Sequence, residues 1–137
     1  MTIKTIADVE FGAQLPVFTP DTGLDNVRRF ARAADWYRPR FIDHDAARAE
    51  GLPGALVPGI MSQGFLVAMI HRWAPDAQII NVDTVFRAPV VVDEAYQISG
   101  VVTDIDEDAG SVVIDLTVSN AANETRVFGT ASVKLPV

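Results

Sequence analysis

The sequence of 137 residues contains no cysteine and only two histidines. The absence of cysteine excludes a disulfide framework, a thiolate nucleophile and a soft metal site. His44 and His71 lie far apart in the sequence, so a zinc centre is not expected either. We therefore expect a protein that holds neither a metal ion nor a cofactor.

Long apolar runs are also missing. No unbroken apolar stretch approaches the roughly 20 residues that cross a bilayer, and the start of the chain lacks the features of a secretory signal. The formal net charge is −7, which repels phosphate backbones. We expect a cytoplasmic protein that binds neither membranes nor nucleic acids. Arg28, Arg29 and Arg32 form either a solvated helix face or a local patch for an anionic ligand.

Apolar residues make up 49% of the chain, enough for the core of one domain. The spacing of apolar residues predicts helices over residues 25–35 and 43–50. Thr22 to Asp25 resembles a capping box before the first helix, and Asp43 is a suitable N-cap for the second. A third helix is predicted over residues 60–73, IMSQGFLVAMIHRW. It is apolar on nearly every side, so it is expected to be buried.

The rest of the chain predicts strands. In residues 111–119, every second side chain is apolar, which is typical of a sheet with one covered face. Short polar turns between consecutive strands favour antiparallel pairing. The prediction is a single α+β domain over residues 1–137, in which an antiparallel sheet wraps around a long central helix. The expected strands span residues 77–86, 95–104, 111–119 and 125–135, with a short extended segment at 14–19.

The order of AARAEGLPGALVPGIM, an apolar helix and FRAPVVVDEAYQISGVVTDID resembles the MaoC-like branch of the hot-dog superfamily. The similarity runs from about Thr22 to the end of the chain, and its most distinctive part is Ala-Arg-Ala-Glu-Gly-Leu-Pro-Gly. The resemblance implies a hot-dog domain that acts on acyl thioesters. Members of this branch include (R)-specific enoyl-CoA hydratases and 3-hydroxyacyl thioester dehydratases.

The hydratase motif of that family is commonly Asp-x-Asn-Pro-x-His. Aligned without a gap on the Ala-Arg-Ala-Glu-Gly segment, its Pro falls on Pro39, but its Asp falls on Trp36, its Asn on Arg38 and its His on Phe41. Indole and phenyl rings cannot transfer a proton near neutral pH. Because each acid or base contributes roughly 10² to 10⁴-fold to the rate, this chain alone is expected to have little hydratase activity.

A binding site could survive this loss. The His of the family's later His-Gly pair falls on Pro58 and leaves Gly59 at the start of the central helix. Unpaired backbone N–H groups at a helix start can hold a thioester carbonyl, although Pro-Gly is also an ordinary helix entry. Ser62 could face the ligand or a partner. Trp36 and Phe41 would either fill the cleft or line it for a large apolar substrate.

Other polar residues near the motif have two readings. A shifted register could restore an acid–base pair from Asp35 and His44, whereas Asp43 and His44 are otherwise expected to cap or border the second helix. Tyr37 could donate to a ligand or be anchored by one hydrogen bond. The candidate catalytic residues are Tyr37, Asp43, His44 and Gly59, and the candidate substrate-binding residues are Trp36, Arg38, Phe41, Pro58 and Ser62.

Three functions remain open at this point. In the first, the chain is a catalytically degenerate, thioester-binding subunit of a heteromeric hydratase or dehydratase, whose partner supplies the Asp/His pair. Alternatively, it cyclises, isomerises or eliminates on a polyketide or terpenoid intermediate, using Trp36, Tyr37 and Phe41 as an aromatic wall. The third possibility is a non-catalytic binding homodimer. The resemblance implies an acyl thioester or related apolar small molecule as ligand, and a homodimer or a heterodimer with another MaoC-like chain.

Overall fold

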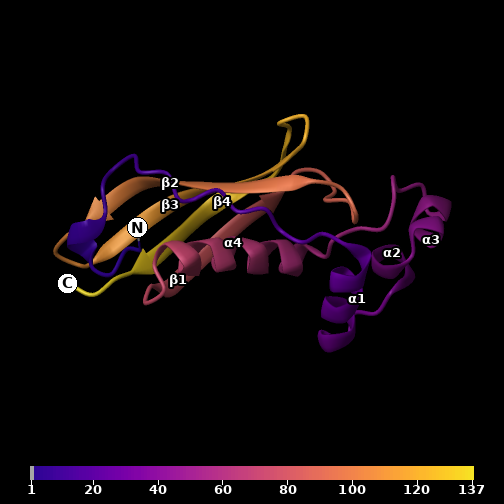
Figure 1. Ribbon diagram of the computed structural model, residues 1–137, viewed down its shortest axis with the longest axis horizontal. Coiled ribbons are helices and arrows are strands. Elements are labelled where there is room, and N and C mark those ends of the chain that lie inside the picture. The colour runs from indigo at the N-terminus through magenta and orange to yellow at the C-terminus, as the bar shows by residue number, and fades with distance from the viewer. Residues whose placement is uncertain (1) are drawn as a thin grey trace.

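The computed structural model describes residues 2–137, so Met1 of the predicted domain lies outside it. One antiparallel sheet in the order β1-β4-β3-β2 carries the long helix α4 on one face (Figure 1). These elements confirm the predicted α+β class, and each lies within two residues of its expected bounds. They are α4 (Gly59–Trp73), β1 (Gln78–Phe86), β2 (Tyr96–Asp106), β3 (Ser111–Asn120) and β4 (Thr125–Lys134).

Three short helices lie beyond one end of the sheet, opposite the end that carries both chain termini (Figure 1). Two of them were predicted, and the four-residue helix between them is too short to show a period in the sequence. They are α1 (Leu24–Ala33), α2 (Pro39–Ile42) and α3 (His44–Ala49), and a 3₁₀ turn precedes them at Ile6–Asp8. Within residues 2–137, every helix is too short or too polar to cross a membrane.

The predicted extended segment near the start of the chain lies against the free edge of β2. Gln14 forms a bridge with Val101, and Phe18 forms one with Ile98. The backbone of Phe18 both donates to and accepts from Ile98, at 3.2 and 2.8 Å. This segment therefore covers the β2 edge, whereas β1 stands at the other edge of the sheet.

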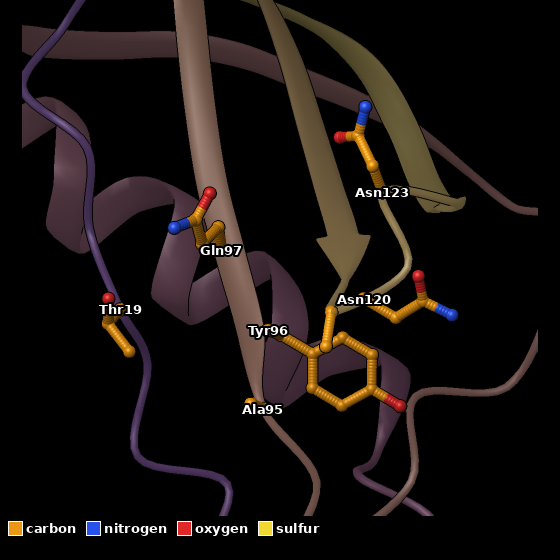
Figure 2. Close-up of a pocket in the computed structure, with 7 residues that line it drawn as sticks. Thr19, Ala95, Tyr96, Gln97, Asn120 and Asn123 are labelled. Atoms are coloured by element: carbon orange, nitrogen blue, oxygen red, sulfur yellow. The ribbon is translucent and has the colours of Figure 1, made fainter.

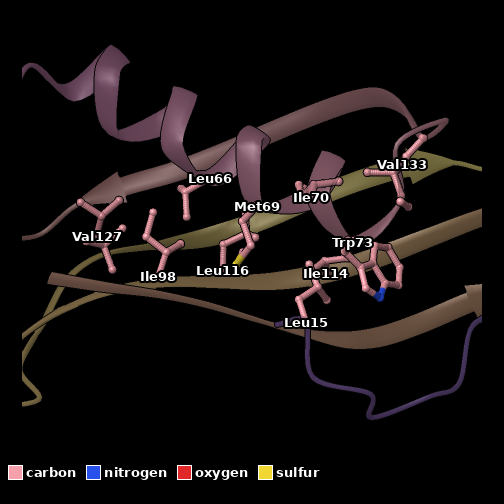
Figure 3. Close-up of a cluster of buried hydrophobic side chains, with 14 of the residues drawn as sticks. Leu15, Leu66, Met69, Ile70, Trp73, Ile98, Ile114, Leu116, Val127 and Val133 are labelled. Atoms are coloured by element: carbon pink, nitrogen blue, oxygen red, sulfur yellow. The ribbon is translucent and has the colours of Figure 1, made fainter. Parts of the chain in front are cut away.

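The core is the layer between α4 and the sheet (Figure 3). The apolar residues of β3 that alternate in the sequence, among them Ile114 and Leu116, are buried against the helix. From α4, Leu66, Met69 and Ile70 fill the same layer. Burial of side chains of this size contributes about 1.5 to 3 kcal/mol each, so this layer fixes α4 on the sheet.

The expectation that α4 is buried on every side is wrong for the single chain. The sheet covers only one face of the helix, and Ile60 on the opposite face is 53% exposed. A Cβ atom added at Gly64 would meet nothing within 4 Å. The helix thus has an uncovered apolar side.

The predicted capping box at the start of α1 is also wrong. Gly23 is the N-cap, and it has no side chain that could cap the helix. The Thr22 hydroxyl donates instead to the carbonyl of Glu94, and the Leu24 N–H donates to Asp93 Oδ1 at 3.0 Å. The loop before β2 therefore caps α1, a long-range contact that a local motif does not reveal.

Two glycines provide a test of this packing, because they meet opposite surroundings. A Cβ at Gly129 in β4 would overlap the carbonyl oxygen of Asp83 and lie 2.8 Å from the Cα of Thr84. We expect Gly129→Ala to lower the free energy of unfolding by about 1 to 3 kcal/mol through overpacking. Gly64→Ala, in open space on a helix, should raise it by roughly 0.5 to 1 kcal/mol. Urea denaturation of both variants measures the difference, and equal effects would contradict the close approach of β1 and β4.

Candidate functional site

A cavity of about 350 Å³ lies at the amino end of α4. It is formed where α2, the loop before α4 and the loop after β1 meet. We call it the α4 cavity. Three of the residues predicted from the sequence line it, namely Phe41, Gly59 and Ser62, together with Phe86, Arg87 and small apolar residues of the two loops.

The amino end of α4 presents unpaired donors. The N–H groups of Met61 and Ser62 bond to the carbonyl of Pro58, which is the N-cap of the helix. Those of Gly59 and Ile60 have no hydrogen-bond partner within residues 2–137. A Cβ added at Gly59 would lie 3.1 Å from the ring of Phe86, so a larger residue here would have to displace that ring. This end of the helix carries a partial positive charge.

Two polar side chains complete the α4 cavity. Ser62 is only 2% exposed and lines the cavity, and its hydroxyl forms no hydrogen bond within the described part of the chain. The hydroxyl is not among the enclosed polar atoms that lack a partner in residues 2–137, so it keeps access to the cavity. Arg87 is exposed at the cavity and forms no ion pair with any residue from 2 to 137. The described residues that line the cavity include no carboxylate and no imidazole. The site can donate hydrogen bonds and balance negative charge, but it offers no side chain that exchanges a proton near neutral pH.

Trp36 and Phe41, which the sequence register aligns with the Asp and His of the hydratase motif, are stacked on each other. Their ring centroids are 6.4 Å apart and their planes differ by 14°. Phe41 lines the α4 cavity, whereas Trp36 is not part of its lining and is 42% exposed. The turn that brings Trp36 there has a positive φ of 58° at Asp35. The two rings thus form one aromatic unit beside the cavity.

Tyr37 and Arg38 lie outside the α4 cavity. The Tyr37 hydroxyl accepts a hydrogen bond from Arg32 Nη2 at 3.2 Å, and the guanidinium of Arg32 lies 4.9 Å from the centre of the tyrosine ring. Arg38 is exposed and precedes α2 as its N-cap. Tyr37 is therefore held at the surface by an arginine and is not a buried anchor.

Asp43 and His44 are engaged in the scaffold. Asp43 Oδ1 accepts from the N–H of Ala46 at 3.1 Å, which confirms Asp43 as the N-cap of α3. His44 Nδ1 accepts from the N–H of Ala55 at 3.0 Å, and His44 Nε2 lies 2.8 Å from Asp93 Oδ2. Because Nδ1 is an acceptor, the proton of the neutral ring is on Nε2 and is donated to Asp93. Both nitrogens are thus occupied, and His44 lies outside the α4 cavity.

Asp93 is the residue that the sequence did not single out. Its carboxylate accepts from His44 and from the N–H of Leu24, so it joins α3, α1 and the loop before β2. The hydrogen bond from His44, followed by that from the Leu24 N–H, lowers the pKa of Asp93 below its ordinary value of 3.8. The backbone of Asp93 also has a positive φ of 69°. The aspartate in VDEAY carried no local signal, because its partners are remote in the sequence.

A larger cavity of about 510 Å³ lies at the turn between β3 and β4 (Figure 2). Thr19, Tyr96, Gln97 and Asn123 border it, and none of the residues predicted for the site does. The Tyr96 hydroxyl accepts from the N–H of Val91 at 2.7 Å, and burial raises the pKa of Tyr96. The described lining contains neither a charged side chain nor a helix start. We therefore regard the α4 cavity as the candidate site.

The contact between His44 and Asp93 predicts a pH dependence of stability. A lowered pKa in the folded protein contributes stability above the ordinary aspartate pKa, and this stability is lost as the pH falls through the lowered value. At neutral pH, the free energy of unfolding of wild type should exceed that of Asp93→Asn by no more than about 1 kcal/mol, because the carboxylate is half exposed. Asparagine tolerates the positive φ, so the substitution removes the charge and one acceptor without adding backbone strain.

Urea denaturation at neutral pH and below about pH 4 measures this difference. The difference in free energy of unfolding between wild type and Asp93→Asn should shrink toward zero at the lower pH. Asp45→Asn is the matched control, since Asp45 is a fully exposed carboxylate on α3 and should resemble wild type. A difference between wild type and Asp93→Asn that stays constant with pH would contradict the assignment.

Solved structures with a similar fold share nearly the whole length of the chain. An (R)-hydratase from A. caviae involved in PHA biosynthesis has a TM-score of 0.88 and 20% identity, over 93% of this chain and 98% of that one. A chain of the ChsH1–ChsH2 complex from Mycobacterium tuberculosis has a TM-score of 0.84 and 20% identity, over 93% and 98%. A MaoC-like dehydratase from Rhodospirillum rubrum has a TM-score of 0.78 and 14% identity, over 97% of this chain and 99% of that one.

No protein-family model matches the chain, and no curated protein matches it by sequence. The similarity is thus one of structure, and it includes hydratases and dehydratases. It agrees with the resemblance found in the sequence. The chain has the hot-dog fold of these (R)-hydratases and MaoC-like dehydratases.

Proposed function

We propose that this chain is a MaoC-like subunit that binds an acyl thioester in the cytoplasm and has no hydratase activity of its own. A second hot-dog chain supplies the acid and the base. The observation that carries the proposal is the chemistry of the α4 cavity. It offers hydrogen-bond donors and a positive charge, and its described lining has no group that accepts or releases a proton near neutral pH.

The thioester carbonyl is held by the N–H groups of Gly59 and Ile60. They are unpaired within the described residues and lie at the positive end of a 15-residue helix. Hydration of a conjugated thioester also needs a base that activates water and an acid that protonates the α-carbon. In the family motif these groups would occupy the positions of Trp36 and Phe41. Here the side chains at the two positions are stacked aromatic rings. The chain therefore keeps the donors that hold the thioester carbonyl and lacks the acid and the base.

A partner is supported by the apolar surface that the single chain leaves uncovered. Strand β1 is an edge of the sheet, and Ile80 on it is 56% exposed. Ile60 on the open side of α4 and Val85 on β1 are exposed as well. An open apolar strand edge is a surface on which another chain pairs. One similar structure is itself a complex of two different chains, ChsH1 and ChsH2.

The aromatic stack favours a second candidate function. Trp36 and Phe41 lie parallel beside the cavity and form a rigid apolar wall. Such a wall could orient a polyketide or terpenoid intermediate for cyclisation, isomerisation or elimination, for which positioning supplies much of the rate. Turnover of such a substrate by a homodimer without any partner would favour this second function over the first.

The proposal is tested with crotonyl-CoA. Wild type should bind it, with a rise in melting temperature, but should leave its double bond unhydrated. The double variant Trp36→Asp, Phe41→His should hydrate it, because it restores an acid and a base that each contribute roughly 10² to 10⁴-fold. Loss of the enoyl thioester absorbance measures the reaction.

Trp36→Ala, Phe41→Ala is the matched control, since it opens the same space without a group that transfers protons. It should bind crotonyl-CoA and leave it unhydrated. Hydration by wild type alone would contradict the proposal. If crotonyl-CoA does not raise the melting temperature of wild type, the proposed thioester binding is contradicted.

The partner surface is tested by Ile80→Lys. A charge near the start of the open β1 edge should weaken association with a second hot-dog chain by at least roughly tenfold, because the lysine is desolvated in the interface. Sedimentation velocity over a concentration series measures the association. Val17→Lys is the control, because Val17 is similarly exposed but lies away from β1. Equal association of the two variants would show that β1 is not the contact surface.

A further inference from the structure

Thioester binding at the start of α4 leaves one charge in the cavity unexplained. Arg87 follows directly after β1, and its N–H is fixed by a 2.9 Å hydrogen bond to the carbonyl of Arg126. Its guanidinium takes part in no hydrogen bond or ion pair among residues 2–137, although the chain has 18 acidic residues. A thioester carbonyl is neutral, so it does not balance this charge.

Ser62 is a second donor without a partner. Serines inside helices often donate back to the carbonyl four residues earlier, which here would be that of Pro58. In this helix the Pro58 carbonyl accepts from the N–H groups of Met61 and Ser62, and the Ser62 hydroxyl has no partner in the described chain. The hydroxyl of this 2% exposed serine keeps access to the cavity, so it is free to donate to a ligand atom that accepts there.

The two side chains share one cavity with the positive end of α4. Its polar side chains, Ser62 and Arg87, can both donate, and none of the described lining residues carries a negative charge. Apolar neighbours such as Val57, Phe86 and Val90 lower the local dielectric, which strengthens the field of a cation. An arginine is permanently charged, and its planar fork matches the two oxygens of a carboxylate or a phosphate.

We propose that the α4 cavity binds an anionic oxygen group of the thioester ligand, with Arg87 as its counter-ion and Ser62 as a hydrogen-bond donor, beside the α4 N–H groups that hold the thioester carbonyl. This inference rests on the proposed function, since it concerns the ligand of the same site. The anionic group is a carboxylate on the acyl part, as in the thioester of a dicarboxylic acid. The phosphates of the carrier, the other source of anionic oxygen, lie a whole pantetheine arm away from the thioester.

Four probes separate these sources in isothermal titration of the full chain. Butyryl-CoA and succinyl-CoA differ by a carboxylate on the acyl part. Butyryl-pantetheine and succinyl-pantetheine repeat the pair without any phosphate. Wild type is compared with Arg87→Gln and Ser62→Ala. Arg48→Gln is the matched control, because Arg48 is an exposed arginine on α3 whose only ion pair in the described chain is with Asp45.

Wild type should bind the probe with the recognised anion about tenfold more tightly than its uncharged counterpart, as expected for a charge-assisted hydrogen bond. Arg87→Gln should abolish this preference, Ser62→Ala should reduce it, and Arg48→Gln should leave it unchanged. A preference between the two pantetheine probes identifies an acyl carboxylate. A preference for CoA over pantetheine that depends on Arg87 would place a carrier phosphate on Arg87 and would overturn the inference.

The inference is overturned if Arg87→Gln leaves the affinities of all four probes unchanged or weakens all four equally. In both cases the uncharged probes still bind wild type, so the proposed thioester binding stands. If none of the four probes binds wild type, both the inference and the proposed function fail. Circular dichroism of each variant establishes that it is folded before titration.

Discussion

The packing of α4 against one face of the sheet is the contact on which the rest of the molecule depends. Leu66, Met69 and Ile70 fill the layer above the alternating apolar residues of β3, and this burial sets the position of the whole helix. Because a helix is rigid, its amino end is fixed at the same time. Gly59 and Ser62 therefore reach the cavity at a defined place, and their donors need no further support.

The three short helices beyond the sheet depend on a different kind of contact. They add little to the core between α4 and the sheet, and Asp93 joins two of them to the loop before β2 through His44 and the N–H of Leu24. The chain between these two helices is also held directly, because the N–H of Leu56 donates to the carbonyl of Arg40 and Arg28 Nε donates to the carbonyl of Ile42. Polar contacts outside the core thus help to position Phe41 beside the cavity.

Much of the fold could be predicted from the sequence, because it follows from local periodicity. The alternation in β3 and the apolar run of α4 each reflect a buried face. The pattern of apolar residues within a short segment is enough to indicate that burial. The caps of α1 could not be predicted in this way. Asp93 reaches Leu24 and His44 from far along the chain, and nothing near VDEAY distinguishes it from an ordinary turn acid.

The candidate site was predictable only in part. The residues predicted from the sequence include Phe41, Gly59 and Ser62, which line one cavity, and Tyr37 and His44, which lie outside it. Local spacing could not distinguish these two groups, because the direction of each side chain depends on how the short helices dock. Arg87 had no signal of its own, since it follows a strand that would suit many β proteins.

The absence of acidic and imidazole side chains from the described lining of the α4 cavity has a consequence for the proposed function. Backbone amides, a serine hydroxyl and an arginine keep their protonation state across the physiological pH range. Under the proposed function, ligand binding by this chain is therefore expected to be insensitive to acidification. Any bell-shaped pH profile of the reaction would then come from ionisable groups on the partner chain that is proposed to supply the acid and the base.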